Sequence, residues 1–408
     1  MENPVSNTRR PVACLSIMKN GLLAGGAATI GVGLLAGGTS ARSVQSKFVR
    51  SLFPGASAVA ACLCLSMFIA QAQAQYQRTD LVSNQAGAAP LQDKHLVNGW
   101  GLVSLPTSPF WVSDNATGFS TLYTAAGAQV PLFVTVPAAP SSPAGTLGTP
   151  TGVVGNIGPN PTDFTITANN TSAKTAFVFA TLDGTISGWT PTVDPITAGN
   201  STATIAADRS SVGAVYTGLA IAVNESKEAF LYAADDGQNR RVDMFDSSFH
   251  FVKSFRDPLI PRDFAPYGIQ AINGKIWVTY TSLSNAPGGF VDVFDTEGRL
   301  VRPFFAVFGP LNSPWGVAQA PADFGPMSNA ILISNNTPHG RIHAFNPETG
   351  EFLGALRDDK GRPIEIDQLW AIQFGQGAAA NGPLNQLFFT AGPSNYTNGL
   401  FGTITLGK

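Results

Sequence analysis

The chain has 408 residues with 24 Lys and Arg, 26 Asp and Glu, and three cysteines, all of which lie in the first 64 residues. From residue 75 onward, 18 basic and 25 acidic residues remain, and this formal charge of −7 argues against nucleic acid as a partner. The same part of the chain has no cysteine for disulfide or thiol chemistry and no apolar segment long enough to insert into a membrane.

The first 74 residues have the composition of a leader. Basic residues precede the apolar segment 56–70, and alternating small residues follow it up to Ala74. This order is typical of a secretory signal peptide, which we place at about 46–74. A second apolar run, 21–38, lies upstream, and we interpret it as sequence ahead of a mis-assigned start codon. The protein is therefore expected to be exported and to act in the periplasm or the extracellular space.

From Tyr76 onward the sequence predicts short β-strands and no helix of several turns. One sequence motif recurs about every fifty residues, at 241–246, 289–300 and 340–350. Each copy alternates apolar and polar residues and reaches an Asp or Asn turn, and the two longer stretches then begin a second alternating run. Alternation with a period of two, broken by turn residues, indicates β-hairpins with one buried face.

The sequence contains six repeats, and they align on one small residue in the first strand of each repeat. These residues are spaced by 51, 66, 50, 48 and 55 positions: Gly101, Gly152, Gly218, Gly268, Gly316 and Ala371. Four strands at this period are typical of propeller blades. We therefore predict an all-β fold for 75–408, a single domain that forms a six-bladed β-propeller with four-stranded antiparallel blades.

The first and last repeats predict how the ring closes. The last repeat has only three strands and ends at 403–406, whereas an additional alternating strand, 77–82, precedes the first repeat. Because an incomplete blade leaves a sheet edge open, we expect the N-terminal strand to close the last blade. The longest spacing contains a Pro-, Asn- and Thr-rich insertion, 191–211, which we interpret as a surface loop.

Several longer motifs resemble those of one protein family. They lie at 96–102, 110–115, 183–189, 289–295 and 311–316. They are similar to an uncharacterised family of exported bacterial six-bladed β-propeller proteins with NHL-like repeats, some of which carry a PEP-CTERM tail that this sequence lacks. The resemblance implies the propeller fold. NHL-type propellers include binding modules as well as lactonase- and lyase-like enzymes, so the resemblance leaves the activity open.

Ligand-binding residues of propellers gather where the first strands begin and where the loops between second and third strands emerge. Polar residues at these positions are candidates for the ligand face: Asn98, Tyr216, Tyr267, Asn312, Asp367, His95 and His339. Asn98, Asn312 and Asp367 each precede a Trp by two or three residues, and their oxygens suit Ca²⁺ or another divalent cation. A metal at the central pore is one hypothesis, and the preference of turns for Asn and Asp is the competing explanation.

Trp100, Trp315 and Trp370 recur at one position of the repeat. Packing between blades explains this recurrence, and a ring of Trp that stacks on sugar rings is the alternative. The sequence contains no nucleophile elbow, no phosphate-binding loop and no zinc motif. No catalytic residue can therefore be named, and whether the chain is an enzyme stays open.

The leading functional hypothesis is an exported, monomeric propeller that serves as a binding or scaffold module of the cell envelope or extracellular space. Its partner would be a small molecule, a glycan or a protein that binds on the propeller face. The alternative is a metal-dependent lactonase- or lyase-like enzyme with its site at the central pore.

The leader assignment predicts that the exported protein begins between Gln73 and Gln75, because the small residues there match a cleavage site. Intact-mass measurement of the exported protein checks this. The run 59–62 resembles a lipobox, so a lipid on Cys62 is the alternative. That lipid, or a chain that begins at Met1, would contradict the prediction.

Overall fold

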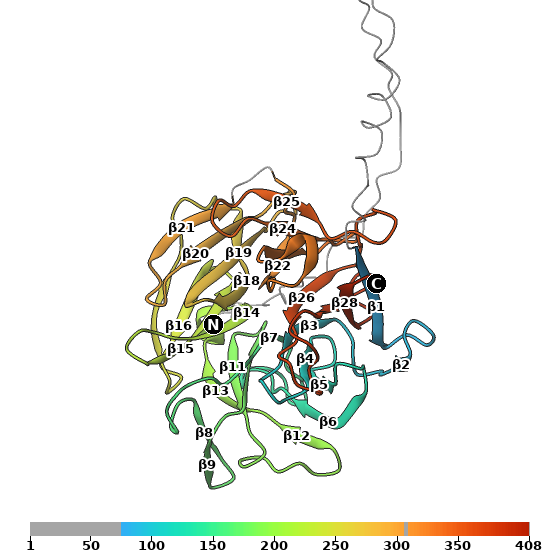
Figure 1. Ribbon diagram of the computed structural model, residues 1–408. Helices are drawn as coiled ribbons and strands as arrows, with labels where there is room; N and C mark the ends of the chain where they lie inside the picture. The colour runs from blue at the N-terminus through green and yellow to red at the C-terminus, as the bar shows by residue number, and fades with distance from the viewer. Residues whose placement is uncertain (1–74, 306–308, 408) are drawn as a thin grey trace, which may run out of the picture. The chain divides into compact units, whose positions relative to one another are not determined.

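In the computed structural model, the unit that follows the predicted leader is built almost entirely of β-strands. The structure describes residues 75–305 and 309–407, and the predicted leader lies outside them. Figure 1 shows the strands of this unit as sheets arranged like blades around a central axis. Within the described residues, no helix is long and apolar enough to cross a membrane.

Six sheets form the blades, and each blade has its first strand innermost. From the axis outward, blade one contains β3 (Gly99–Val103), β4 (Phe110–Asp114), β5 (Phe119–Tyr123) and β6 (Gln129–Thr135), and blade two contains β7 (Pro150–Gly155), β10 (Phe177–Thr181), β11 (Thr185–Trp189) and β13 (Thr204–Asp208). Blade three contains β14 (Tyr216–Val223), β15 (Ala229–Asp235), β16 (Arg241–Phe245) and β17 (Phe251–Phe255), and blade four contains β18 (Phe264–Ile272), β19 (Lys275–Ser282), β20 (Phe290–Phe294) and β21 (Leu300–Phe305). Blade five contains β22 (Pro314–Gln319), β23 (Ile331–Asn335), β24 (Ile342–Phe345) and β25 (Phe352–Ala355), and blade six contains β26 (Leu369–Phe374), β27 (Leu387–Ala391) and β28 (Leu400–Leu406). The predicted six-bladed propeller is confirmed.

The N-terminal strand β1 (Tyr76–Ser83) completes blade six, as predicted. It pairs antiparallel with β28, from Tyr76 opposite Leu406 to Ser83 opposite Leu400. The buried Tyr76 hydroxyl also donates to Phe324 O at 2.7 Å, which ties the strand to blade five. A two-residue strand, β2 (Leu91–Gln92), then pairs parallel with the outer side of β1.

The insertion 191–211, predicted to be a surface loop, contains two strands of the blades. It contains β12 (Asn200–Thr202), which pairs parallel with β6 of blade one, and β13, the outer strand of blade two. The segment therefore joins two neighbouring blades. It lacks a strong apolar alternation because β13 is only half-buried. A separate hairpin, β8 (Thr165–Ala168) and β9 (Thr171–Lys174), lies in the connection between the first two strands of blade two.

Buried hydroxyl groups join neighbouring blades next to the axis. Each donates a hydrogen bond to a backbone carbonyl in the first strand of the following blade: Thr151 to Tyr216 O (2.7 Å), Thr217 to Pro266 O (3.4 Å), Thr279 to Pro314 O (2.7 Å), Ser334 to Trp370 O (2.6 Å) and Thr390 to Trp100 O (2.7 Å). These bonds span five of the six blade junctions. At the junction of blades one and two, Ser113 is the corresponding residue, and its Oγ has no hydrogen-bond partner within the described residues.

The strand that supplies the hydroxyl depends on the residue before the small repeat position. In blades four, five and six that residue is aromatic, and the hydroxyl comes from the second strand. In blades two and three it is Thr151 or Thr217, which supplies the hydroxyl itself, and the second strand carries Ala180 or Ala234 instead. One hydroxyl therefore reaches each of these junctions from either of two strands.

The small residue itself is needed because first strands of neighbouring blades approach closely there. A Cβ on Gly268 would lie 2.0 Å from Trp315 O, and one on Gly101 would lie 2.3 Å from Thr151 O. Both contacts involve backbone atoms, which cannot rotate away. This steric limit explains the repeat that the sequence shows.

Thr279→Val should lower the free energy of unfolding by about 1–3 kcal/mol, because it keeps the side-chain shape but leaves the buried Pro314 carbonyl without this donor. Ser113→Ala is the matched control, and its effect should stay within about 0.5 kcal/mol, since Ser113 Oγ makes no hydrogen bond to any of the described residues. Denaturant unfolding of both variants checks the pair. Equal losses of stability would contradict the account of the blade junctions.

Candidate functional site

Four aromatic residues meet where the first strands begin. We call Trp100, Tyr267, Trp315 and Trp370 the aromatic plug; they come from blades one, four, five and six, and each is less than 10% exposed. The rings of Trp100 and Trp370 stack at a centroid distance of 3.7 Å, and those of Trp315 and Tyr267 lie 5.9 Å and 5.6 Å from Trp370. The recurring Trp residues thus pack against one another and close this end of the axis.

Hydrogen bonds fix two of the indoles. Trp315 Nε1 donates to Thr217 O at 3.1 Å, so this side chain reaches from blade five to blade three. Trp370 Nε1 donates to Asn98 Oδ1 at 2.8 Å. Asn98, a predicted ligand residue, is therefore buried beside the plug and engaged with it.

The three predicted metal ligands each have partners of their own. Asn98 Nδ2 donates to Asn115 Oδ1 at 3.2 Å, Asn312 Oδ1 accepts from Gly288 N at 3.3 Å, and Asp367 Oδ2 accepts from Ser394 N at 2.8 Å. In residues 75–305 and 309–407, no group of three or more His, Cys, Asp or Glu side chains could hold a metal ion. A metal bound by Asn98, Asn312 and Asp367 stays a prediction.

Backbone geometry separates Asn98 from the other two. Asn98, Ser313 and Gln368 each lie two residues before a Trp of the plug and have φ values of 51°, 48° and 52°. They share one left-handed turn position, whereas Asn312 and Asp367 lie one residue earlier. Asn adopts this conformation more readily than most residues, so the turn alone accounts for an Asn at position 98.

The remaining predicted residues lie in separate contacts. The Tyr267 ring belongs to the aromatic plug. His95 Nδ1 lies 3.1 Å from buried Asp93 Oδ1, and the exposed His339 pairs with Glu365 at 3.1 Å. Neither histidine contact includes a residue of the plug.

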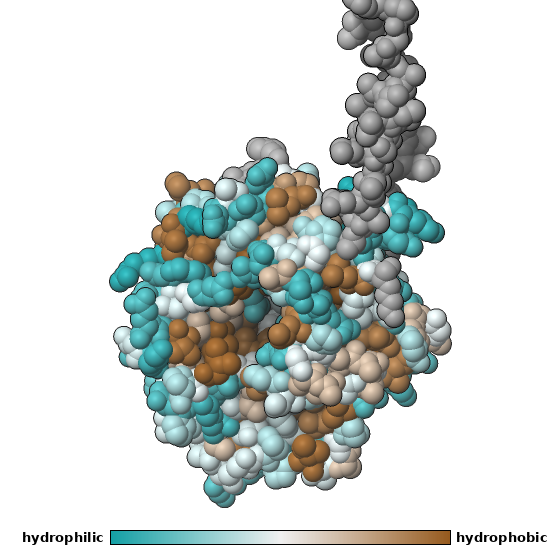
Figure 2. Space-filling model, in the orientation of Figure 1, coloured by the Kyte–Doolittle hydropathy of each residue, from teal (hydrophilic) through white to brown (hydrophobic). Residues whose placement is uncertain are grey.

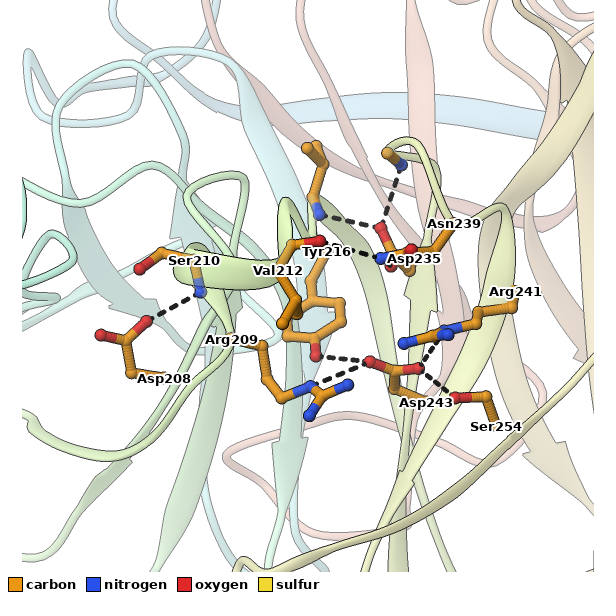
Figure 3. Close-up of polar contacts among 12 residues, drawn as sticks. Asp208, Arg209, Ser210, Val212, Tyr216, Asp235, Asn239, Arg241, Asp243 and Ser254 are labelled. Atoms are coloured by element: carbon orange, nitrogen blue, oxygen red, sulfur yellow. Dashed lines mark hydrogen bonds and ion pairs between the residues drawn. The ribbon is translucent and has the colours of Figure 1, made fainter.

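Tyr216 belongs to a polar cluster around Asp243, which Figure 3 shows. The fully buried Asp243 carboxylate accepts from Ser254 Oγ (2.7 Å), Arg241 Nε (2.8 Å), Tyr216 OH (3.0 Å) and Arg209 Nε (3.3 Å). Burial, and then the charge of Asp243, raise the pKa of the Tyr216 hydroxyl, which keeps it protonated as a donor. Since Arg209 follows the outer strand of blade two, this cluster joins blades two and three.

Other acidic side chains are buried with fewer partners. Burial, with the charge of nearby Asp257 as the second cause, raises the pKa of Asp292 to about 7, and its Oδ2 has no hydrogen-bond partner in the described part of the chain. Burial, followed by the charge of Asp235, raises the pKa of Asp236 to about 7. Burial likewise raises the pKa of Asp114 well above its usual value. These carboxyls affect stability and lie outside the central cavity.

A cavity opens at the other end of the axis, where the first strands finish. Its volume is about 270 Å³, and residues from all six inner strands line it, with Trp315 and Gly316 at the level of the plug. Figure 2 shows the surface hollowed near the centre of the ring, between hydrophobic side chains. The cavity is thus a blind channel, closed by the aromatic plug and open at the ends of the first strands.

The wall of the blind channel is mostly apolar. Its polar side chains are Ser104, Gln270, Gln373 and Gln376, and no charged residue or histidine is among the described residues that line it. These glutamines were not among the predicted site residues, which were placed on the face where the first strands begin. Their one sequence signal is the pair Gln373 and Gln376 at the end of the first strand of blade six.

Comparison with known proteins leaves the activity of the chain open. No protein-family model matches the chain. An uncharacterised protein of Acanthamoeba polyphaga mimivirus is 28% identical over 349 residues, which are 82% of this chain and 87% of that protein. A second uncharacterised mimivirus protein is 30% identical over 225 residues, 51% of this chain and 40% of that protein. The resemblance to an exported bacterial family stays a prediction.

Solved structures with a similar arrangement include propellers and lyases. A streptogramin B lyase matches with a TM-score of 0.46 and 11% identity, over 82% of this chain and 98% of that one. Virginiamycin B lyase from Staphylococcus aureus matches with a TM-score of 0.44 and 14% identity, over 82% and 99%. The WD40 β-propeller domain of Doa1 matches with a TM-score of 0.42 and 9% identity, over 80% and 96%. These matches assign no activity or binding site to this chain.

The raised pKa of Asp292 predicts a pH-dependent stability. In the unfolded chain an Asp carboxyl has a pKa of about 3.9. Between about pH 4 and 7, the folded protein therefore retains a proton that the unfolded chain has lost. The free energy of unfolding should fall as the pH rises through this window, by at most about 1.4 kcal/mol per pH unit from this group.

Asp292→Asn removes this ionisation, so its stability profile should be flatter between about pH 5 and 7, and the variant should be more stable than wild type at about pH 8. Asp359→Asn, at an exposed position, is the control and should keep the wild-type slope. Denaturant unfolding at several pH values measures both. A slope that Asp292→Asn leaves unchanged would show that this carboxyl does not titrate in the window.

Proposed function

We propose that this protein is a ligand-binding propeller that holds a small molecule in the blind channel. The supporting observation is the cavity of about 270 Å³, which reaches all six inner strands and is closed at one end by the aromatic plug. Pockets for small molecules typically begin at about 300 Å³ and have apolar walls with a few polar groups. The channel has this character, and its volume lies just below this range.

The residues of the channel wall favour binding over catalysis. General acid–base catalysis needs a titratable group near the reacting atoms. The described residues that line the channel provide none, and the Ser104 hydroxyl is 3.2 Å from Gln376 Nε2, which donates to it. A metal-dependent lactonase- or lyase-like enzyme is the alternative predicted from the sequence, and no contact on the channel wall favours it.

The rigidity of the wall supports the same proposal. Hydroxyl bonds join neighbouring blades at five junctions, and the plug packs four side chains against one another. A preformed cavity spares a ligand the free energy of ordering its site. The channel is therefore suited to bind a small molecule without rearrangement.

We also propose that the protein acts after export, in the periplasm or the extracellular space. The support is the signal-like segment 46–74 and the absence of cysteine from 75 onward. A glycan or protein partner on the propeller face, and the monomeric state, stay predictions.

An uncharged dye that fluoresces in apolar surroundings, phenylnaphthylamine, tests the channel. It should bind wild-type protein at one site, and Gln270→Trp should weaken binding by about tenfold or more, because an indole at the exposed end of β18 covers the channel mouth. Leu259→Trp is the matched control. Leu259 is 81% exposed in the connection that precedes β18, and this substitution should leave binding unchanged.

Fluorescence titration of the three proteins separates the outcomes. Saturable binding that only Gln270→Trp weakens supports the proposal. Equal binding to all three proteins would place the dye elsewhere, and an absence of saturable binding to wild type would also contradict the proposal.

A further inference from the structure

We infer that the ligand of the blind channel is an uncharged molecule with an amide-like head group, and that Gln373 and Gln376 bind this group. The inference rests on the proposed binding function and adds the chemical class of the ligand. It is based on the absence of charge from the wall and on the orientation of the two glutamine side chains.

A charged ligand would lose its hydration in this channel without gaining a counter-ion. None of the described wall residues carries a charge, and the polar side chains of the wall are one serine and three glutamines. An isolated ion in an apolar site costs far more free energy than a neutral polar group, which needs only a hydrogen-bond partner. The wall therefore selects neutral molecules.

Gln376 offers an acceptor. Its Nε2 donates to the backbone carbonyl of Ser104 and to Ser104 Oγ at 3.2 Å. A carbonyl oxygen can only accept, so the nitrogen of this side chain must face Ser104. The other amide atom, Oε1, has no hydrogen-bond partner among the described residues, and it remains able to accept a bond from a ligand.

Gln373 offers a donor. Its Oε1 accepts from the backbone N–H of Ser104 at 3.2 Å, and because an N–H can only donate, this orientation is also determined. Its Nε2 lies 3.5 Å from Ser104 Oγ, which is a weak contact at best. At least one N–H of Gln373 is therefore available.

The donor and the acceptor lie together, because both side chains bond to the same residue, Ser104. An amide group carries one N–H side and one C=O side, so it could donate to Gln376 Oε1 and accept from Gln373 Nε2. A carboxylate has no N–H for Gln376 and would place its charge near that oxygen. An ammonium group has no acceptor for Gln373.

Asn381 holds Gln376 in place. It is fully buried, and its Nδ2 donates to the carbonyls of Leu105 (3.0 Å), Pro106 (3.1 Å) and Ser108 (3.1 Å) in blade one. Its Oδ1 accepts the backbone N–H of Gln376 at 3.1 Å. The connection 375–386 of blade six is thus anchored across blade one, and Asn381 is a positioning residue for the amide-binding pair.

Calorimetric titration with naphthamide, naphthoate and naphthylmethylammonium tests the inference, because these probes share one apolar ring system and differ in the head group. Naphthamide should bind at least about tenfold more tightly than either ion. Gln376→Met should weaken naphthamide by about fivefold and leave methylnaphthalene, which has no polar head, unchanged. Gln386→Met is the control, since this glutamine lies in the same connection but outside the channel wall.

Each outcome decides between the two proposals. If all probes bind equally well and Gln270→Trp blocks them, the channel binds ligands but the amide inference is wrong. If naphthamide binds best but Gln376→Met leaves its affinity unchanged, the assignment of the glutamine pair is wrong. If none of the probes binds, this inference fails, and the dye titration alone then decides the proposed function.

Discussion

The ring depends on one buried hydrogen bond that recurs at its blade junctions, from a Ser or Thr hydroxyl to a backbone carbonyl of the next first strand. Innermost strands have no partner strand on their axial side, so their carbonyls need other donors. The junction of blades one and two lacks this bond, since Ser113 Oγ is unpaired in the described residues. There β12 crosses over and pairs with blade one. Next to the axis, Asn115 Nδ2 instead donates to the Pro150 carbonyl in the first strand of blade two at 3.2 Å. The pairing of β12 with β6 joins the same two blades at their outer edge.

The residue before the small repeat residue of each first strand determines where the channel is closed. At this position four blades carry an aromatic residue, and blades two and three carry Thr. Trp315 of blade five reaches across the axis to the carbonyl of Thr217 in blade three. The four aromatic rings fill one end of the axis, and the glycines and aliphatic residues farther along the first strands leave the other end hollow. The blind channel therefore follows from the way the blades are joined.

The number of blades, the second strand of each blade and the closure by β1 could be predicted because alternation, a required small residue and an unpaired edge are local features of the sequence. The roles of β12 and β13 could not, since these outer strands are short and mostly polar or half-buried. Asn98, Asn312 and Asp367 were grouped as predicted ligands, but Asn98 lies one position later in the repeat than the other two. The left-handed turn that Asn98 shares with Ser313 and Gln368 reveals this shift. Gln373 and Gln376 were missed because their orientation depends on Ser104 and Asn381, residues distant in the sequence or without a motif.

We propose that the ligand lies in the channel below the plug, on the side where the first strands finish. A crystal structure of the full protein grown with naphthamide would test this position. We expect one molecule between Trp315 and the channel mouth, with its amide group on Gln373 and Gln376. Ordered ligand on the opposite face, beside Asn98 and Asp367, with an empty channel, would contradict it.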